Sequence, residues 1–276
     1  MSFFHELRYA VRSLARQPSV TAVAVTTLAL GLGLNTAVFA VAYGILWRPL
    51  PYPEPDRLVT ITARFGDGDG GGIRLNTFSA WADRLRTAHL SGYQTTERSL
   101  RGAGPARIVS VTSVTEDFFA VLGLPAAQGV APPLPPGDPR AVISAPLARR
   151  METSGAPAVG QTVTIGDRRY DVTAVMPATF AFPSTEVDAW IAVPPPPVAN
   201  TGSGSYQLIG RLSEGATRAQ VGEDADRVVR TINSAEWNTT VRTLESLLLD
   251  DTRPAIQVSL AAAVLVLVVA CTSTTT

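Results

Sequence analysis

The longest apolar run of the chain lies near its N-terminus and predicts a helix that spans a membrane. Residues 20–47 contain no charged side chain over 28 positions, a length typical of such a helix. At 1.5 Å per residue the run would extend roughly 42 Å, enough to cross a hydrocarbon core with some tilt. A cleavable signal peptide is the alternative, because Ala40 and Ala42 have the spacing of a cleavage site. The apolar core of a signal peptide, however, has only about 7 to 15 residues.

The apolar pattern before this run predicts an amphipathic helix, at the cytoplasmic membrane surface, within residues 1–19. An ordinary globular helix is the alternative. One face carries apolar residues, and the opposite face carries three arginines: Arg8, Arg12 and Arg16. By the positive-inside rule these arginines place the N-terminus in the cytoplasm and deliver the chain after Trp47 to the other side. Trp47 and Arg48 are expected to anchor the helix at the outer interface.

Small and polar residues inside the first apolar run predict contact with other helices. Ala29, Gly33 and Ala37 recur every four residues, and small residues at that spacing allow a second helix to approach closely. Asn35 lies near the midpoint, where an amide without a partner is costly. The alternative is that glycine and alanine are simply common in membrane helices.

Residues 51–254 predict a folded α+β domain on the far side of the membrane. Four prolines between positions 49 and 55 make the segment after the first run stiff and extended. Alternating positions then predict strands, with a hairpin at 162–175 turning at Gly166 and Asp167, and periods near 3.6 predict helices. Strands are expected at 58–65, 108–114, 141–143, 162–175, 188–193 and 206–212. Helices are expected at 76–86, 115–122 and 217–233, and another should follow the strand 141–143 and end at Met151. The irregular order of strands and helices favours α+β over α/β.

A second uncharged stretch, residues 255–276, predicts a C-terminal transmembrane helix that returns toward the cytoplasm. No arginine follows it, and the sequence ends on a Thr-rich segment. We therefore expect this helix to be incomplete and the reading frame to be truncated.

Composition excludes several kinds of chemistry. All 23 basic residues are arginine, and the formal net charge is zero. Without lysine the chain has neither a Walker A loop nor a Schiff-base lysine. No basic stripe accompanies a nucleic-acid-binding motif, so nucleic-acid binding has no support. The single cysteine, Cys271, has no partner for an internal disulfide.

The residues that most often carry catalysis or metal binding do not form a recognisable site. His5 and His89 are expected on opposite sides of the membrane. Asp67 and Asp69 begin a calcium-loop pattern that fails at its third and twelfth positions. The carboxylates near the predicted strands show no acid–base pairing: Asp171, Glu186 and Asp188. We expect no catalytic, cofactor or metal site in this chain.

Several segments resemble ABC-transporter permeases of the MacB/FtsX type, especially their duplicated-permease branch. They lie at residues 7–10, 26–39 and 46–59 (LWRPLPYPEPDRLV) in the N-terminal part, and at 114–123 (VTEDFFAVLG), 159–165, 170–183 and 210–217 (GRLSEGAT) in the middle. The middle of the chain is similar to the extracytoplasmic, or periplasmic, core domain of that family. The resemblance covers almost the whole chain.

The resemblance implies a non-enzymatic permease subunit of the bacterial inner (plasma) membrane, with a cytoplasmic N-terminus and an outer core domain. ATP would be bound by a separate ABC ATPase subunit, so no cofactor is expected here. A second permease copy or half and membrane lipid are the other implied partners. The core domain would be a mixed fold in which one module is split around an inserted one. It would move as the partner hydrolyses ATP, for export or extraction of a substrate.

This sequence departs from the family at its end, where family members continue into a cytoplasmic segment that docks the ATPase. That departure keeps an alternative function open: a membrane-anchored extracytoplasmic interaction or sensor module without transport activity. An anchored hydrolase would need a nucleophile and a base, and the sequence presents no such pair.

Overall fold

The computed structural model describes residues 50–65, 70–102, 104–152, 155–194, 205–232 and 236–249, together with separate positions between 18 and 40 and at 258, 259 and 262. The chain divides into two compact units, Leu50–Leu247 and a second that joins Met1–Pro49 to Leu248–Thr276. Within the described residues, no helix combines the length and the apolar character needed to cross a membrane. Most of 20–47 and 255–276, and all of 1–17, lie outside the described residues.

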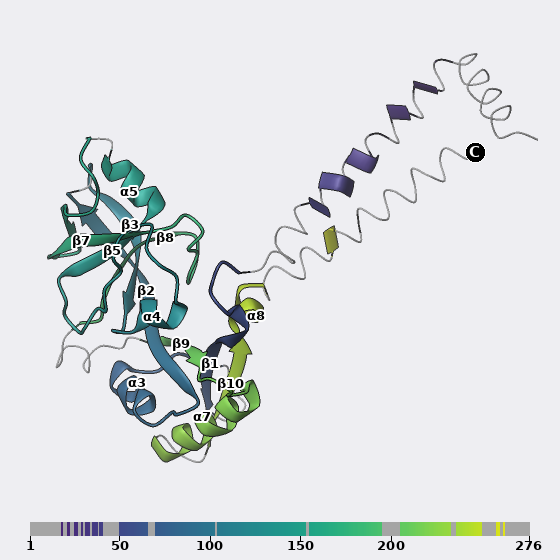
Figure 1. Ribbon diagram of the computed structural model, residues 1–276. Coiled ribbons are helices and arrows are strands. Elements are labelled where there is room, and N and C mark those ends of the chain that lie inside the picture. Colours follow the sequence, from purple (N-terminus) through teal and green to yellow (C-terminus); the bar gives the residue numbers. More distant parts are fainter. Residues whose placement is uncertain are drawn as a thin grey trace, which may run out of the picture. The chain divides into compact units, whose positions relative to one another are not determined.

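The unit Leu50–Leu247 is organised on one mixed sheet (Figure 1). The described strands are β1 (Leu58–Phe65), β2 (Ala88–Arg101), β3 (Arg107–Val114), β4 (Gln128–Gly129), β5 (Arg140–Ser144), β6 (Thr162–Ile165), β7 (Arg168–Met176), β8 (Val187–Ala192), β9 (Gln207–Leu212) and β10 (Trp237–Thr243). Their order is β10-β1-β9-β2-β3-β8-β5-β7-β4, and β6 pairs with β2 and β7. The pairs β3–β8 and β5–β7 are parallel, and the other pairs are antiparallel.

Helices cover parts of this sheet, and their order among the strands confirms the α+β prediction. They are the 3₁₀ helix η1 (Pro55–Arg57) and the α-helices α3 (Leu75–Ala82), α4 (Phe118–Leu122), α5 (Ala145–Met151), α7 (Arg218–Ile232) and α8 (Leu244–Leu249).

The first hydrophobic core lies between α3, α7 and the sheet formed by β1, β9 and β10. Helix α7 buries one stripe of apolar residues, Val221, Ala225, Val228 and Val229, as its helical period predicts. Burying a valine side chain contributes roughly 1.5 kcal/mol or more. Trp81 of α3 is fully buried in the same core. The carboxylate of Asp224, also buried, accepts from Arg86 N and Thr87 Oγ1 and so fixes α7 to the segment before β2.

The second hydrophobic core is built from residues between Leu100 and Ile191. Helix α5 packs its buried residues onto β5, β7 and β8, and Ser144 Oγ caps it by accepting from Leu147 N. The β6–β7 hairpin turns at Gly166 and Asp167 with Ile165 opposite Arg168, and Gly166 has a φ of 62°. This confirms the predicted hairpin, because a residue with positive φ is needed at that turn position.

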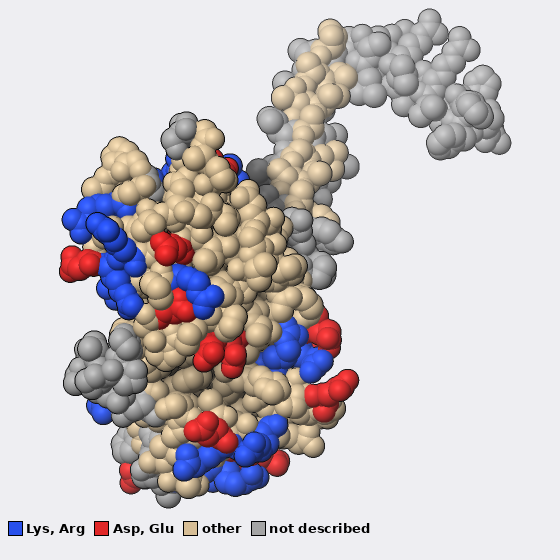
Figure 2. Space-filling model, turned by 60° about the vertical axis from the view of Figure 1, so that its left-hand side comes forward, with Lys and Arg blue, Asp and Glu red and all other residues tan. Residues whose placement is uncertain are grey.

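Strand β2 joins the two cores. Leu90 is buried in the first core and Leu100 in the second. In the sequence, the segments that build the first core lie on both sides of those that build the second. The part of the domain that holds the first core is therefore split around an inserted part that holds the second. Figure 2 shows acidic and basic side chains interspersed over the face that it displays.

One predicted helix begins later than its sequence indicated. The sequence predicts a helix at 115–122, but α4 begins at Phe118. The hydroxyl of Thr115 bonds instead to Ser91 Oγ and to Gly92 N, both at 2.9 Å. Thr115 therefore follows the end of β3 and is bonded to β2. Asp117 occupies the N-cap position of α4 without a side-chain hydrogen bond to the helix.

Candidate functional site

The segment 50–57 lies at the start of the unit Leu50–Leu247, directly before β1, and is held in place by the rest of that unit. Its prolines fix the backbone, and Pro55 begins η1. Glu54 has a φ of 46°, a left-handed conformation that is uncommon for a residue other than glycine. We call this segment the lead-out. We use the name junction for the site where the lead-out meets three other parts of the domain. These are the last turn of α4 with Gly123, Arg211 and Leu212 of β9, and Thr243 of β10.

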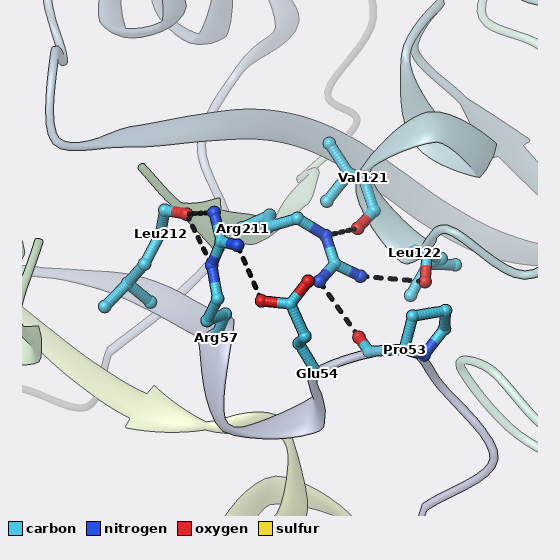
Figure 3. Close-up of polar contacts among 7 residues, drawn as sticks. All are labelled: Pro53, Glu54, Arg57, Val121, Leu122, Arg211 and Leu212. Atoms are coloured by element: carbon cyan, nitrogen blue, oxygen red, sulfur yellow. Dashed lines mark hydrogen bonds and ion pairs between the residues drawn. The ribbon is translucent and has the colours of Figure 1, made fainter. Parts of the chain in front are cut away.

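Arg211 is the central side chain of the junction (Figure 3). Its Nε donates to Val121 O at 2.7 Å, and its Nη2 donates to Leu122 O at 3.0 Å. The carbonyls of a helix's last turn have no partner within the helix, so Arg211 caps α4. Its Nη1 donates to Pro53 O at 3.0 Å. One guanidinium therefore joins β9, α4 and the lead-out.

A second arginine fixes the lead-out to β9. Arg57 donates from Nε and Nη2 to Leu212 O at 3.2 and 2.8 Å, and from Nη1 to Glu54 Oε2 at 2.6 Å (Figure 3). The hydrogen bond from Arg57, and then its charge, lower the pKa of the exposed Glu54 carboxyl. Burial, and then the charge of Arg57, lower the pKa of Arg211. The ordinary pKa of a guanidinium lies so far above neutral pH that Arg211 remains a cation despite this lowering.

Tyr52 attaches the lead-out to a cluster of aromatic residues. Its side chain is 5% exposed, and its ring meets that of Phe180 edge to face at 6.0 Å between centroids. Phe180 in turn packs on Trp190 at 5.0 Å and on Phe119 at 6.3 Å. Trp190 Nε1 donates to Phe182 O, which orients the indole. The lead-out is thus held by burial of its tyrosine as well as by arginine.

The chain leaves the core domain beside the point where it enters. Val59, at the start of β1, pairs with Thr243, at the end of β10. Helix α8 begins directly after Thr243, whose hydroxyl accepts from Ser246 N at 3.2 Å and caps it. The lead-out therefore ends, and α8 begins, next to paired positions of the neighbouring strands β1 and β10.

The membrane-related residues predicted from the sequence fall largely outside this site. Arg8, Arg12, Arg16, Trp47 and Arg48 lie outside the described residues. The described positions Ala29, Gly33, Asn35 and Ala37 are helical, and their role in helix packing stays a prediction. Asn35 Nδ2 donates to Gly31 O at 2.9 Å, one turn earlier, which lowers the cost of an amide in an apolar environment.

The carboxylates and histidines considered above do not meet. Asp171 accepts from Thr162 Oγ1 at 2.8 Å, and Asp188 pairs with Arg150 at 2.6 Å. His89 lies on β2, whereas His5, Asp67 and Asp69 are outside the described residues. In the described part of the chain, no group of three or more His, Cys, Asp or Glu side chains is placed to hold a metal ion.

Sequence reasoning did not identify the side chains that form the junction. Tyr52, Glu54 and Arg57 lie in the segment 46–59, and Arg211 lies in 210–217, both of which carried the family resemblance. Those motifs therefore pointed to the segments that contain these four side chains, but not to the contacts between them. The contact between them joins residues 158 positions apart, and no local pattern predicts such a contact.

Comparison with known proteins agrees with the fold. The family model of the MacB-like periplasmic core domain matches residues 21–228. The periplasmic region of MacB from Actinobacillus actinomycetemcomitans aligns with a TM-score of 0.51 at 13% identity, over 73% of this chain and 92% of that one. A domain of a permease protein from Porphyromonas gingivalis aligns with a TM-score of 0.50 at 16% identity, over 70% and 92%. Among curated proteins no relative matches.

The structural likenesses, at these identities, show the shared fold, and the family model shows the relationship. The resemblance to permeases of the MacB/FtsX type is confirmed. Permease components of this type are not themselves enzymes. Because the match covers more than half of the chain, the protein belongs to the family of MacB-like periplasmic core domains.

Proposed function

We propose that the chain is a permease subunit of an ABC transporter, anchored in the inner membrane by residues 20–47 and 255–276. Its core domain, 51–254, would lie outside the cytoplasm, and a separate ATPase subunit would bind ATP. Family membership supports this assignment. The pairing of Val59 with Thr243 supports it independently, because both connections to the uncharged segments begin at one place on the sheet.

We further propose that the junction transmits movement from the first membrane helix into the core domain. The observation that carries this is the bonding of Arg211 to Pro53 O, Val121 O and Leu122 O. A displacement of the lead-out must move β9 and α4 with it, or break these bonds. Burial of Tyr52 against Phe180 gives the lead-out a second attachment, to the loop between β7 and β8.

Labelling with a membrane-impermeant maleimide tests the topology. In a Cys271→Ser background, Arg218→Cys places a thiol at the exposed start of α7, and Ser2→Cys places one near the N-terminus. We expect Arg218→Cys to be labelled in intact spheroplasts and Ser2→Cys only after the membrane is permeabilised. Labelling of Ser2→Cys but not Arg218→Cys in intact spheroplasts would refute the proposal, as would recovery of the full chain from the cytosol.

The transmission proposal is tested in proteoliposomes that contain the full chain and its partner ATPase. An environment-sensitive fluorophore at Ala120→Cys reports on α4, where Ala120 is exposed. We expect ATP to change its emission, and Arg211→Gln to remove most of that change while ATP hydrolysis continues. Arg218→Gln is the matched control and should leave the signal intact. An undiminished signal in Arg211→Gln would show that movement reaches α4 by another route.

The anchored sensor without transport predicts a different outcome in the same experiment. A sensor would retain the topology, and the chain would neither bind an ATPase subunit nor respond to ATP at α4.

A further inference from the structure

A half-open groove lies beside α4 and has a volume of about 480 Å³. That size falls within the range of pockets that hold small organic molecules, roughly 300–1,000 Å³. Most of its lining is apolar and comes from α4 and from the two stretches 124–126 and 129–133. Phe119 and Ala120 are the lining residues on α4 itself, and the three prolines Pro125, Pro132 and Pro133 contribute rigid surface.

Backbone contacts fix the shape of the groove. Leu134 N donates to Glu116 O at 3.2 Å, which holds the segment 129–133 beside the start of α4. Ala127 N donates to Val175 O at 2.8 Å, and Gly129 pairs with Ala174 of β7. A ligand would therefore meet a largely preformed surface and lose less free energy to ordering it.

Two carboxylates give the groove its charge. Glu116 and Asp117 both line it and both are exposed. Neither forms an ion pair within the part of the chain that the structure describes, and the described lining includes no arginine. Asp117 is also not used to cap α4. The lining thus combines apolar surface with an uncompensated negative charge.

We propose that this groove binds an amphiphilic organic cation, a small molecule with an apolar body and an amine. The apolar body would cover Phe119, Val130 and the prolines, and the ammonium group would pair with Glu116 and Asp117. Val130 is 78% exposed in the free protein, so a bound apolar body would bury surface now in contact with water. This inference does not depend on the role proposed for the junction.

The groove and the junction share a helix. Phe119 faces the groove and contacts the ring of Phe180, on which Tyr52 packs. Val121 and Leu122, on the same short helix, accept from Arg211. A ligand in the groove would therefore contact the helix to which the lead-out is tied.

The test uses the full chain in lipid nanodiscs, without the ATPase, and ¹⁹F NMR. In a Cys271→Ser background, a trifluoromethyl label on Val130→Cys reports on the rim of the groove, and one on Arg218→Cys reports on α7, away from it. The probes are 4-phenylbutylammonium, the neutral 4-phenylbutanol and the anionic 4-phenylbutanoate, which share one apolar body. We expect saturable shifts at position 130 and none at position 218. The amine should bind about fivefold more tightly than the alcohol, the size expected for a solvent-accessible ion pair.

Two variants separate charge from shape. Glu116→Gln combined with Asp117→Asn should abolish the preference for the amine and leave the affinity for the alcohol unchanged, which also shows that the groove is intact. Ala120→Trp should block all three probes. The proposal is overturned if the amine and the alcohol bind equally to the labelled Val130→Cys protein, if the preference for the amine survives in the double variant, or if no probe gives a saturable shift at position 130.

Discussion

Arg211 and Pro53 lie 158 positions apart in the sequence, and Arg211 Nη1 donates a hydrogen bond to Pro53 O at 3.0 Å. The same guanidinium holds the last carbonyls of α4. The planar, forked guanidinium donates in several fixed directions at once, which the single ammonium of lysine does not. The junction thus depends on the shape of this side chain as well as on its charge.

Replacing Arg211 should weaken the core domain in proportion to the bonds that are lost. We expect Arg211→Lys to lower the free energy of unfolding by about 1–2 kcal/mol, and Arg211→Gln by about 2–3 kcal/mol, because carbonyls of the junction lose a charged donor. Urea unfolding followed by the fluorescence of the buried Trp81 and Trp190 measures both. Arg218→Lys, at the exposed start of α7, should stay within about 0.5 kcal/mol of the native protein. Equal effects at positions 211 and 218 would contradict the assignment.

Tyr52 should act through its ring and not through its hydroxyl. The hydroxyl oxygen is buried and has no hydrogen-bond partner of ordinary geometry among the described residues, although it lies near the Ala181 backbone. Tyr52→Phe should therefore keep the native stability at pH 7 or raise it by up to about 1 kcal/mol. Tyr52→Ala removes the ring from Phe180 and should cost about 3–5 kcal/mol. The same urea assay compares the two, and a large loss in Tyr52→Phe would show that the hydroxyl is bonded.

The elements that depend on local pattern were predictable from the sequence. The amphipathic stripe of α7 placed the helix at 217–233, and the structure has Arg218–Ile232. Gly166 and Asp167 indicated the β6–β7 turn for a physical reason, the positive φ at Gly166. Strand β2 was missed because its burial does not alternate regularly: the residues from Leu90 to Tyr93 are buried in succession, and the positions from 94 to 99 are partly buried or exposed. Strand β10 was missed because it lies at the sheet edge and its positions are partly buried or exposed, without an alternating buried face.

The candidate site was less predictable than the fold. The lead-out could be recognised as stiff, since proline restricts the backbone wherever it occurs. The partners of Arg211 are carbonyls, which every residue carries, so their identity depends on the fold alone. The delayed start of α4 has a similar origin, because Thr115 bonds across the sheet to Ser91 rather than to the following helix.

Burial of Tyr52 predicts a loss of stability at alkaline pH. Burial raises the pKa of Tyr52 from 10.0 to about 12. Between those values the folded protein keeps a proton that the unfolded chain has released, so the contribution is complete below pH 10 and is lost as the pH rises toward 12. The loss for this residue is up to about 2–3 kcal/mol. Burial also raises the pKa of Tyr93, Tyr170 and Tyr206, so the native decline should be steeper still.

Urea unfolding at successive pH values from 8 to 12 checks this sign. The decline should be shallower in Tyr52→Phe than in the native protein, so the difference in unfolding free energy between the two proteins should be constant below about pH 10 and widen above it. Parallel curves across that range would indicate that the Tyr52 hydroxyl is accessible to water in the folded protein.

Gly129 should be the least replaceable of the glycines near the groove. It has a φ of 70°, and a Cβ at this position would lie 2.2 Å from Thr173 O on β7. Gly129→Ala must therefore move β4 away from β7, and we expect a loss of more than about 3 kcal/mol, together with a change in the ¹⁹F shift at the neighbouring position 130. Gly104 is the matched control, because its φ of 87° carries a similar backbone strain while a Cβ there would meet nothing within 4 Å. Gly104→Ala should lower the free energy of unfolding by about 1–2 kcal/mol, because it introduces the backbone strain without a steric clash. If the two substitutions cost the same, β4 is not held against β7 as closely as the register of Gly129 with Ala174 requires.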